Sequence, residues 1–364
     1  MAYLVVPLSV SSLPQIVGWY DPAQKGGCLR LAANSYLPAK GDPSVNLPGL
    51  RRGDLVVLEN GRVVSVNGAP PTGLEDRPDF AKLGAVHPSR PLTLETAKAS
   101  SPRTAETQRV VDLICPFGFG QRALIVSPPK AGKTIMLQAL AESVAENHPA
   151  AILLILLVDE RPEEVSEMID WGHGEVIASS FDLPHERHVA VAEMVFEHAR
   201  RQVELGRDVV IVLDSLTRLA RSHNTAGSSS RRTLTGGLDA GAMAIPKSHF
   251  GAARAVPEGG SLTVIATALV ETESRMDDVI FEEFKGTGNA ELRLTRELAD
   301  RRIYPAVDIQ ASGTRREELL GSAALVAARQ NLRKQLAGMS QQQAIEALLA
   351  QVRRSKTNQE LLKI

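Results

Sequence analysis

Short apolar runs alternate with longer amphipathic stretches through the middle of the chain. Five runs have the composition of buried strands: residues 123–126, 151–158, 176–179, 209–213 and 262–269. Between them, residues 135–146, 163–171 and 189–205 have the apolar spacing of amphipathic helices. Continuous apolar strands joined by helical crossovers are typical of a parallel sheet covered on both faces. The pattern therefore predicts a wound α/β domain.

The two ends of the chain have different patterns. Residues 1–66 contain short apolar stretches separated by glycine-containing turns, and residues 55–58 and 62–66 predict a hairpin, which favours a small barrel or sheet. Residues 67–109 are rich in Pro, Ser, Thr and Gly and predict a linker. The α/β pattern occupies residues 110–320. Residues 321–364 are rich in Ala, Leu, Gln and Arg and predict a C-terminal helical segment.

Composition narrows the class of protein. The 364 residues are enough for two domains, and 41 basic against 42 acidic residues give a formal net charge of −1, so any nucleic-acid contact must be local. Cys28 and Cys115 are too few for a disulfide framework, which fits a reducing cytoplasm. The chain has no Lys or Arg before Lys25 and no apolar run long enough to span a bilayer. We therefore expect a soluble cytoplasmic protein that does not contact a membrane.

A phosphate-binding loop follows the first predicted strand of the α/β domain. Residues 127–134 read SPPKAGKT and precede a predicted helix; the standard pattern begins with Gly where this chain has Ser127. In such a loop, backbone N–H groups face an anion, the lysine before the hydroxyl residue reaches the β- and γ-phosphates, and the hydroxyl binds Mg²⁺. The strand–loop–helix context favours binding of a nucleoside triphosphate over an ordinary turn. The expected contacts are Lys130, Ala131, Gly132, Lys133 and Thr134.

Two carboxylates follow later strands of the same pattern. Asp214 ends the run 209–213 and is a candidate ligand for the metal, although an Asp in this place can also cap a helix, as Ser215 can. Glu160 follows the run 151–158 and can orient and deprotonate an attacking water. An acidic first turn of a helix is the other interpretation, and it suits Glu163 and Glu164 better than Glu160.

Several cations lie in or near these segments. Each could contact phosphate, and each could equally be a surface or ion-paired residue. They are Lys130, Arg161, Arg187 and Arg218.

Seven segments carry a resemblance to one family. They are 128–134 (PPKAGKT), 159–165 (DERPEEV), 213–221 (LDSLTRLAR), 234–237 (LTGG), 250–254 (FGAAR), 282–289 (EEFKGTGN) and 312–320 (SGTRREELL). With these motifs, the chain resembles the Rho transcription termination factor family of ring-shaped, RNA-dependent ATPases and helicases. The resemblance implies a RecA-type P-loop NTPase domain, preceded by a small OB-like β-barrel.

The resemblance also implies an activity and its partners. The activity is an ATP-dependent RNA translocase or helicase that terminates transcription by releasing the nascent transcript, with ATP and Mg²⁺ as cofactors. The partners are single-stranded RNA, the RNA polymerase elongation complex and five further copies in a homohexamer. One alternative is a regulatory ring protein that binds nucleotide and RNA without terminating transcription. Another is a rotary ATP synthase subunit or a DNA recombinase, which the segments 284–289 and 312–315 disfavour.

Individual roles follow from the matched motifs. The resemblance gives Lys133 and Glu160 catalytic roles and makes Arg315 a finger that reaches the γ-phosphate of the neighbouring subunit. It makes Tyr304 the ring that stacks on adenine, unless Tyr304 is a core residue. The RNA contacts that it implies are Arg231, Arg232 and Thr233 in the loop 224–237, Arg275 in the loop 273–278, and also Lys285 and Arg30.

The N-terminal region departs from the family pattern. The family stacks pyrimidines on aromatic residues in two barrel segments, whereas this chain reads GGCLR at 26–30 and DPSV at 42–45, without an aromatic ring. A base on an aromatic ring contributes about 1–3 kcal/mol, so a shortened barrel with weakened RNA binding is expected. Trp19, Tyr20 or Tyr36 could instead supply substitute rings.

Overall fold

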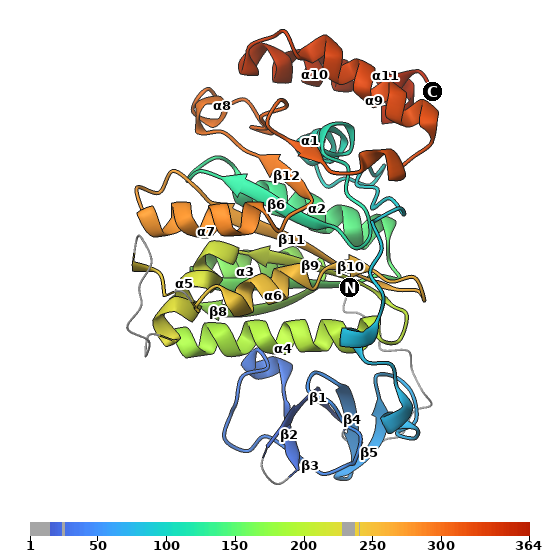
Figure 1. The fold of residues 1–364 in the computed structure, drawn as a ribbon, viewed down its shortest axis with the longest axis vertical. Helices are drawn as coiled ribbons and strands as arrows, with labels where there is room; N and C mark the ends of the chain where they lie inside the picture. The colour runs from blue at the N-terminus through green and yellow to red at the C-terminus, as the bar shows by residue number, and fades with distance from the viewer. Residues whose placement is uncertain (1–14, 24–25, 228–236, 240) are drawn as a thin grey trace.

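The computed structural model describes residues 15–23, 26–227, 237–239 and 241–364. The chain forms three layers along its long axis: an N-terminal β-sheet, a central α/β domain and a C-terminal group of helices (Figure 1). Residues 231–233, and with them three of the expected RNA contacts, lie outside the described residues.

The N-terminal region is a five-stranded antiparallel, OB-like sheet in the order β3-β2-β1-β4-β5. Its core is formed mainly by aliphatic residues and Tyr20. The hairpin expected near Asn60 and Gly61 is confirmed. The strands are β1 (Gln15–Pro22), β2 (Gly27–Arg30), β3 (Ser44–Val45), β4 (Leu55–Glu59) and β5 (Arg62–Val66).

The central domain is built on a second sheet in the order β13-β12-β6-β11-β9-β7-β8, with β10 paired to β11. All five strands expected from the apolar runs are present, and they pair in parallel. The strands are β6 (Arg122–Ser127), β7 (Ile152–Glu160), β8 (Glu175–Ser180), β9 (Asp208–Asp214), β10 (Arg254–Ala255), β11 (Ser261–Leu269), β12 (Ala290–Arg293) and β13 (Gly313–Thr314).

Helices cover both faces of this sheet and form two separate apolar cores. One core lies between the sheet and α1, α2, α9 and α10, and the other lies between the sheet and α4, α5, α6 and α7. The helices are α1 (Pro102–Ile114), α2 (Lys133–Asn147), α3 (Pro162–Trp171), α4 (His185–Val203), α5 (Leu216–Ala226), α6 (Ala244–Gly251), α7 (Arg275–Lys285), α8 (Arg296–Asp300), α9 (Ala323–Leu336), α10 (Gln341–Arg354) and α11 (Asn358–Leu362).

Helix α1 begins inside the stretch that composition predicted as linker. The Ser101 side chain accepts a hydrogen bond from the Thr104 backbone N–H, and Pro102 occupies the first helical position. Both are favourable at a helix start, so the same residues that suggested an irregular segment initiate a helix.

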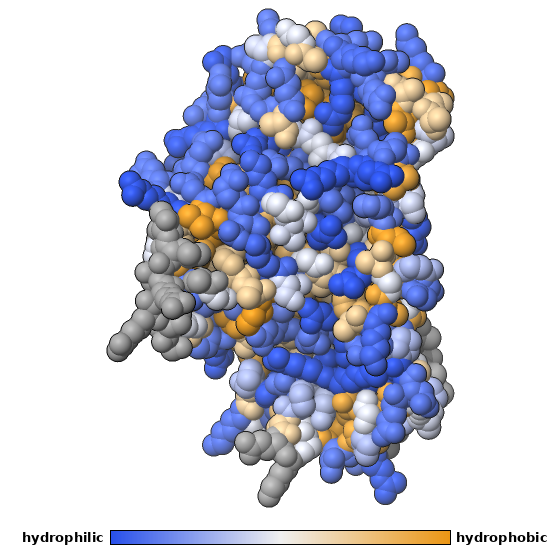
Figure 2. Space-filling view, in the orientation of Figure 1, coloured by the Kyte–Doolittle hydropathy of each residue, from blue (hydrophilic) through white to orange (hydrophobic). Residues whose placement is uncertain are grey.

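The surface seen in Figure 2 is mostly hydrophilic, with apolar residues in separate small patches. Among the described residues, no helix is both long enough and apolar enough to cross a bilayer.

Candidate active site

The P-loop joins β6 to α2 at the carboxyl edge of the parallel sheet. Its backbone is left-handed at Lys130 (φ 65°) and at Gly132 (φ 91°), and α2 begins directly afterwards at Lys133. The first N–H groups of a helix have no partner within the helix, so a 15-residue helix starting here attracts an anion. Ala131 is buried, Lys130 is exposed, and Thr134 lies half-buried in the first turn.

Three residues from three separate motifs meet next to this loop. The Lys133 ammonium donates hydrogen bonds to Glu160 Oε1 at 2.9 Å and to Asp214 Oδ1 at 2.6 Å. Glu160 is the last residue of β7, and Asp214 is the last residue of the adjacent strand β9. Both carboxylates are buried, with 2% and 4% of their surfaces exposed. The parallel sheet therefore brings the expected phosphate lysine, metal ligand and catalytic carboxylate into one cluster.

The electrostatics of this cluster follow from burial and close charges. Burial, together with the Asp214 carboxylate, raises the pKa of Glu160 to about 7, against the opposing effect of Lys133. Burial alone would lower the pKa of Lys133, but the two carboxylates outweigh it and raise that pKa. A carboxylate with a pKa near neutrality is well matched to general-base chemistry at physiological pH.

Thr267 completes the cluster and was not expected from the sequence. Its hydroxyl donates to Asp214 Oδ1 at 2.8 Å, and its side chain is fully buried in β11, between β6 and β9. The hydroxyl helps to fix the Asp214 carboxylate beside Lys133. A Thr within the apolar run 262–269 was the available signal, but the order of strands in the sheet was needed to interpret it.

The candidate cations divide between the site and the surface. Arg218, in the first turn of α5, donates to the backbone carbonyl of Asp159 and lies 3.5 Å from Glu160 Oε2. Arg161, Arg187 and Lys130 are all exposed, and Arg161 Nη1 lies 3.9 Å from Glu164 Oε1. Only Arg218 is placed against the carboxylate cluster.

The oxygen donors at the site suit Mg²⁺. Mg²⁺ prefers hard oxygen ligands and is usually held by one or two protein groups together with phosphate oxygens and water. The Thr134 hydroxyl and the Asp214 carboxylate are donors of this kind. Among the residues that the structure describes, no cluster of three or more His, Cys, Asp or Glu could hold a metal by itself. The donor set thus fits a cation bound together with a nucleotide.

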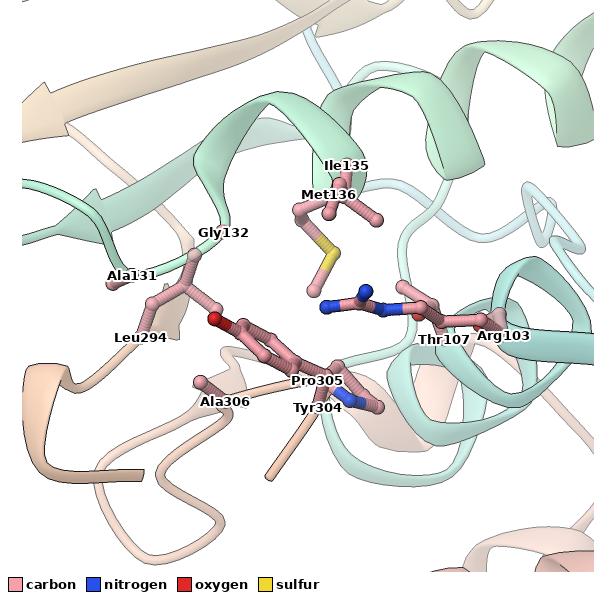
Figure 3. Close-up of a pocket in the computed structure, with 10 residues that line it drawn as sticks. All are labelled: Arg103, Thr107, Ala131, Gly132, Ile135, Met136, Leu294, Tyr304, Pro305 and Ala306. Atoms are coloured by element: carbon pink, nitrogen blue, oxygen red, sulfur yellow. The ribbon is translucent and has the colours of Figure 1, made fainter. Parts of the chain in front are cut away.

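Tyr304 lies beside the P-loop, as the base-stacking expectation requires. A Cβ at Gly132 would be 3.3 Å from the edge of the Tyr304 ring, so the ring packs directly against this glycine. Tyr304 is half-buried and lines a small pocket with Met136 and Arg103 (Figure 3). The ring therefore packs against the core at the wall of this pocket and is not enclosed in the core.

Arg315 lies far from the P-loop of its own chain. It follows β13, which pairs with the first residues of β12, and its charge acts on Arg122 at the start of β6. The P-loop follows the opposite end of β6. Arg315 is exposed, so it cannot serve the cluster around Lys133 but is available to another molecule.

Comparison with known proteins identifies the family. The nucleotide-binding domain of the ATP synthase alpha/beta family matches residues 107–314. A protein named transcription termination factor Rho from Streptosporangium roseum is 50% identical over 360 residues, which cover 95% of this chain and 91% of the relative. The chain belongs to the transcription termination factor Rho family. A Rho protein from Gemmatimonas aurantiaca is 55% identical over 95% of this chain, and the chain spans 50% of the length of that relative.

Solved structures support the fold of this Rho family member. An ATPase from the type III secretion system of pathogenic bacteria has a TM-score of 0.60 at 24% identity, covering 70% of this chain and 72% of that one. The assembled ATPase EscN from enteropathogenic E. coli has a TM-score of 0.59 at 23% identity, covering 72% of this chain and 60% of that one. At this level of identity the likeness concerns the fold alone.

The RNA contacts implied by the Rho resemblance lie on different surfaces. Arg275 is the exposed first residue of α7, and the first turn of this helix is held against α5 because Arg221 pairs with the buried Asp277 at 2.5 Å. Thr272 donates to the same carboxylate at 2.6 Å. Lys285, at the other end of α7, is exposed and lies 3.5 Å from Glu282. Both cations are open to solvent, and their role in binding RNA stays a prediction.

The N-terminal rings of this Rho family member face inward. Trp19 stacks on Tyr36 with ring centroids 3.5 Å apart and on His198 of α4 with centroids 4.2 Å apart. Trp19, Tyr20 and Tyr36 are 1%, 6% and 8% exposed. None of the three presents a free face to a base, so the suggestion that they replace the lost stacking rings is wrong in this conformation.

Arg30 is held by carboxylates of its own sheet. Its guanidinium donates to Asp21 Oδ2 at 2.8 Å and to Asp42 Oδ2 at 2.7 Å. A guanidinium committed to two carboxylates has fewer donors left for an RNA phosphate. The RNA contact of Arg30 stays a prediction, and these ion pairs give the residue a structural role.

Proposed function

We propose that this protein is an ATP-driven RNA translocase that terminates transcription by releasing the nascent transcript from RNA polymerase, acting as a cytoplasmic homohexamer. The observation that carries the proposal is the contact of Lys133 with both Glu160 and Asp214 at the start of α2. The relatives that cover this chain are named for transcription termination, which supports the same conclusion.

The site residues divide the work of ATP hydrolysis. A bound triphosphate gives Lys133 a new anionic partner, which draws its ammonium from the carboxylates toward the β- and γ-phosphates. Glu160 then loses part of the attraction that holds it and can orient a water against the γ-phosphate. Thr134 and Asp214 would hold Mg²⁺, whose charge would stabilise the negative charge that develops on the phosphate.

The location of Arg315 supports hydrolysis between subunits. An arginine finger stabilises charge on the transferred phosphoryl group and contributes about 10³- to 10⁵-fold in rate. Arg315 is exposed and lies at the opposite strand ends from the P-loop. In a ring, such an arginine would reach the nucleotide of the adjacent copy, so hydrolysis would require assembly.

Single-stranded RNA is the proposed substrate of the motor. Arg275 and Lys285 are exposed cations at the two ends of α7. The loop 224–237 adds the cations Arg231 and Arg232 and the hydroxyl of Thr233 to the proposed RNA contacts. Arginine and lysine attract backbone phosphates without reading the sequence. With the barrel rings buried, we infer that these motor loops supply most of the RNA affinity.

The test is ATP turnover by the full chain with Mg²⁺, with and without a long poly-pyrimidine RNA. We expect RNA to stimulate turnover and Arg315→Ala to abolish the stimulated rate. A second assay measures transcript release from a stalled polymerase. RNA-independent turnover would contradict the translocase, and stimulated turnover without release would contradict the termination activity alone.

A further inference from the structure

Arg103 lies on the ring that the proposed function assigns to the nucleotide base. Its guanidinium carbon is 3.9 Å from the centroid of the Tyr304 ring, the distance of a stacked cation–π contact. Arg103 is the second residue of α1, and Figure 3 shows its side chain reaching from that helix toward Met136 and Tyr304. The residue was not expected at the site, because composition assigned this segment to a linker.

The contact covers one face of the Tyr304 ring at the wall of a small pocket. The pocket bounded by Arg103, Met136 and Tyr304 is lined further by Gly132 of the P-loop and by Leu294 and Ala306. A purine that stacks on this face would need the space that the guanidinium occupies. The Tyr304 edge already abuts Gly132, so the ring has little freedom to turn away.

Arg103 has no competing ion pair in the part of the chain that the structure describes. Its side chain is exposed and its position in the first turn leaves it able to move into solvent. Opening the pocket therefore breaks the contact with Tyr304 and requires no rearrangement of the sheet or of α2.

We propose that Arg103 is a latch on the base-binding face of Tyr304, and that any nucleotide must displace its guanidinium before the base can stack. This inference rests on the proposed nucleotide site but adds to it a residue that lowers affinity. The latch acts on every base alike, because it blocks the ring and reads no base edge.

The strength of the contact sets the expected effect. A cation–π contact at an exposed site corresponds to a closed-to-open ratio of about 2 to 5. Apparent affinity falls by the fraction of molecules that are competent to bind, so removing the latch should tighten nucleotide binding about three- to sixfold.

The experiment compares the equilibrium dissociation constants of ATP, GTP and inorganic tripolyphosphate for the full chain and for Arg103→Ala, all with Mg²⁺. We expect ATP and GTP to bind more tightly by the same factor and tripolyphosphate, which has no base, to bind equally to both chains. Arg103→Lys keeps the charge but loses the planar stacking group, and should fall between the two. Arg354→Ala, which removes an exposed charge at the end of α10, is the matched control and should change nothing.

The outcomes separate the latch from the nucleotide site itself. ATP binding by the parent chain without a gain in Arg103→Ala overturns the latch and leaves the proposed function standing. An equal gain for tripolyphosphate, or a gain for one base only, also overturns it, because the residue would then act through charge or through base reading. Absence of ATP binding in both chains overturns the latch and the proposed function together.

Discussion

The N-terminal sheet and the α/β domain place the same kinds of residue in opposite settings. In the α/β domain, Lys133 meets two buried carboxylates at the carboxyl ends of the adjacent strands β7 and β9, beside the N-terminus of α2. In the N-terminal sheet, Arg30 is paired to Asp21 and Asp42, and Trp19 lies between two other rings. The charges of both arrangements are paired within the protein, but only the first lies beside backbone N–H groups that attract an anion.

Residue type alone therefore does not distinguish a binding site from a structural contact. What separates them is whether the paired charges lie beside the start of a helix that attracts an anion, as Lys133 does, or within a sheet, as Arg30 does. The comparison predicts that substitutions in the α/β site change catalysis with little loss of stability, and that substitutions in the N-terminal sheet do the reverse.

The largest expected effect is on catalysis. Glu160→Gln keeps the shape of the side chain but removes the base, so kcat for ATP should fall by about 10²- to 10⁴-fold. Binding of ATP should persist, as measured by equilibrium titration. If Glu160→Gln lowered the stability of the N-terminal sheet by as much free energy as it raises the barrier to ATP hydrolysis, the proposed division between the two regions would be wrong.

The next effect is on stability. Trp19→Ala removes a fully buried ring from the stack with Tyr36 and His198 and should lower the free energy of unfolding by about 3–5 kcal/mol. Val17→Ala, on the same strand with 40% of the residue exposed, is the control and should change stability by less than about 1 kcal/mol. Denaturant titration measures both, and equal effects would show that the stack does not anchor the barrel.

The pH dependence of stability should identify the contact of the N-terminal sheet with His198 of α4. Burial lowers the pKa of His198 from 6.5 to about 4, so the unfolded state binds protons that the folded state does not between these values. This contribution is therefore absent above about pH 6.5 and destabilises the fold progressively as the pH falls toward 4. Between pH 7 and 4.5 the parent should lose about 2–3 kcal/mol more than His198→Phe, which stacks but does not titrate. Parallel stability curves for the two chains would contradict this assignment.

The smallest effect concerns Arg30. Removing its guanidinium takes away the cation paired with Asp42 and leaves Asp21 with Arg52, at 3.2 Å, and should cost about 1–2 kcal/mol of stability. RNA affinity should change less in Arg30→Ala than in Arg275→Ala. In Arg275→Ala, loss of a phosphate contact should reduce the slope of log binding constant against log salt concentration by about one. Filter binding across several salt concentrations measures this, and a larger loss of RNA affinity in Arg30→Ala would restore the barrel as a main RNA surface.

The sequence predicted the parts of the molecule that are specified locally or by the parallel sheet. Continuous apolar runs predicted five strands within a few residues, and the shared carboxyl edge explains why Glu160, Asp214 and Lys133 could be placed together. Thr267 was missed because its strand lies between two strands that are distant from it in sequence. Helix α1, and with it Arg103, was missed because Pro and Ser serve both irregular segments and helix starts.

The contacts of the barrel with α4 could not be predicted because they join residues more than a hundred positions apart. The His198 Nδ1–H donates a hydrogen bond to the Gly53 carbonyl oxygen at 2.8 Å. Gly53 itself is required there, since a Cβ would lie 2.4 Å from the His198 backbone nitrogen. Arg52 pairs with Glu193 at 3.0 Å across the same boundary. Neither local periodicity nor a motif marks such pairs.

The contacts between the N-terminal sheet and α4 also connect this sheet mechanically to the α/β domain. α4 packs against β7, β8 and β9, and two of these strands end in the residues that hold Lys133. A force applied to the N-terminal sheet therefore passes through α4 to the strands of the central sheet that α4 contacts. A nucleic acid or partner protein that pulled on the N-terminal sheet would therefore load the strands that carry Glu160 and Asp214.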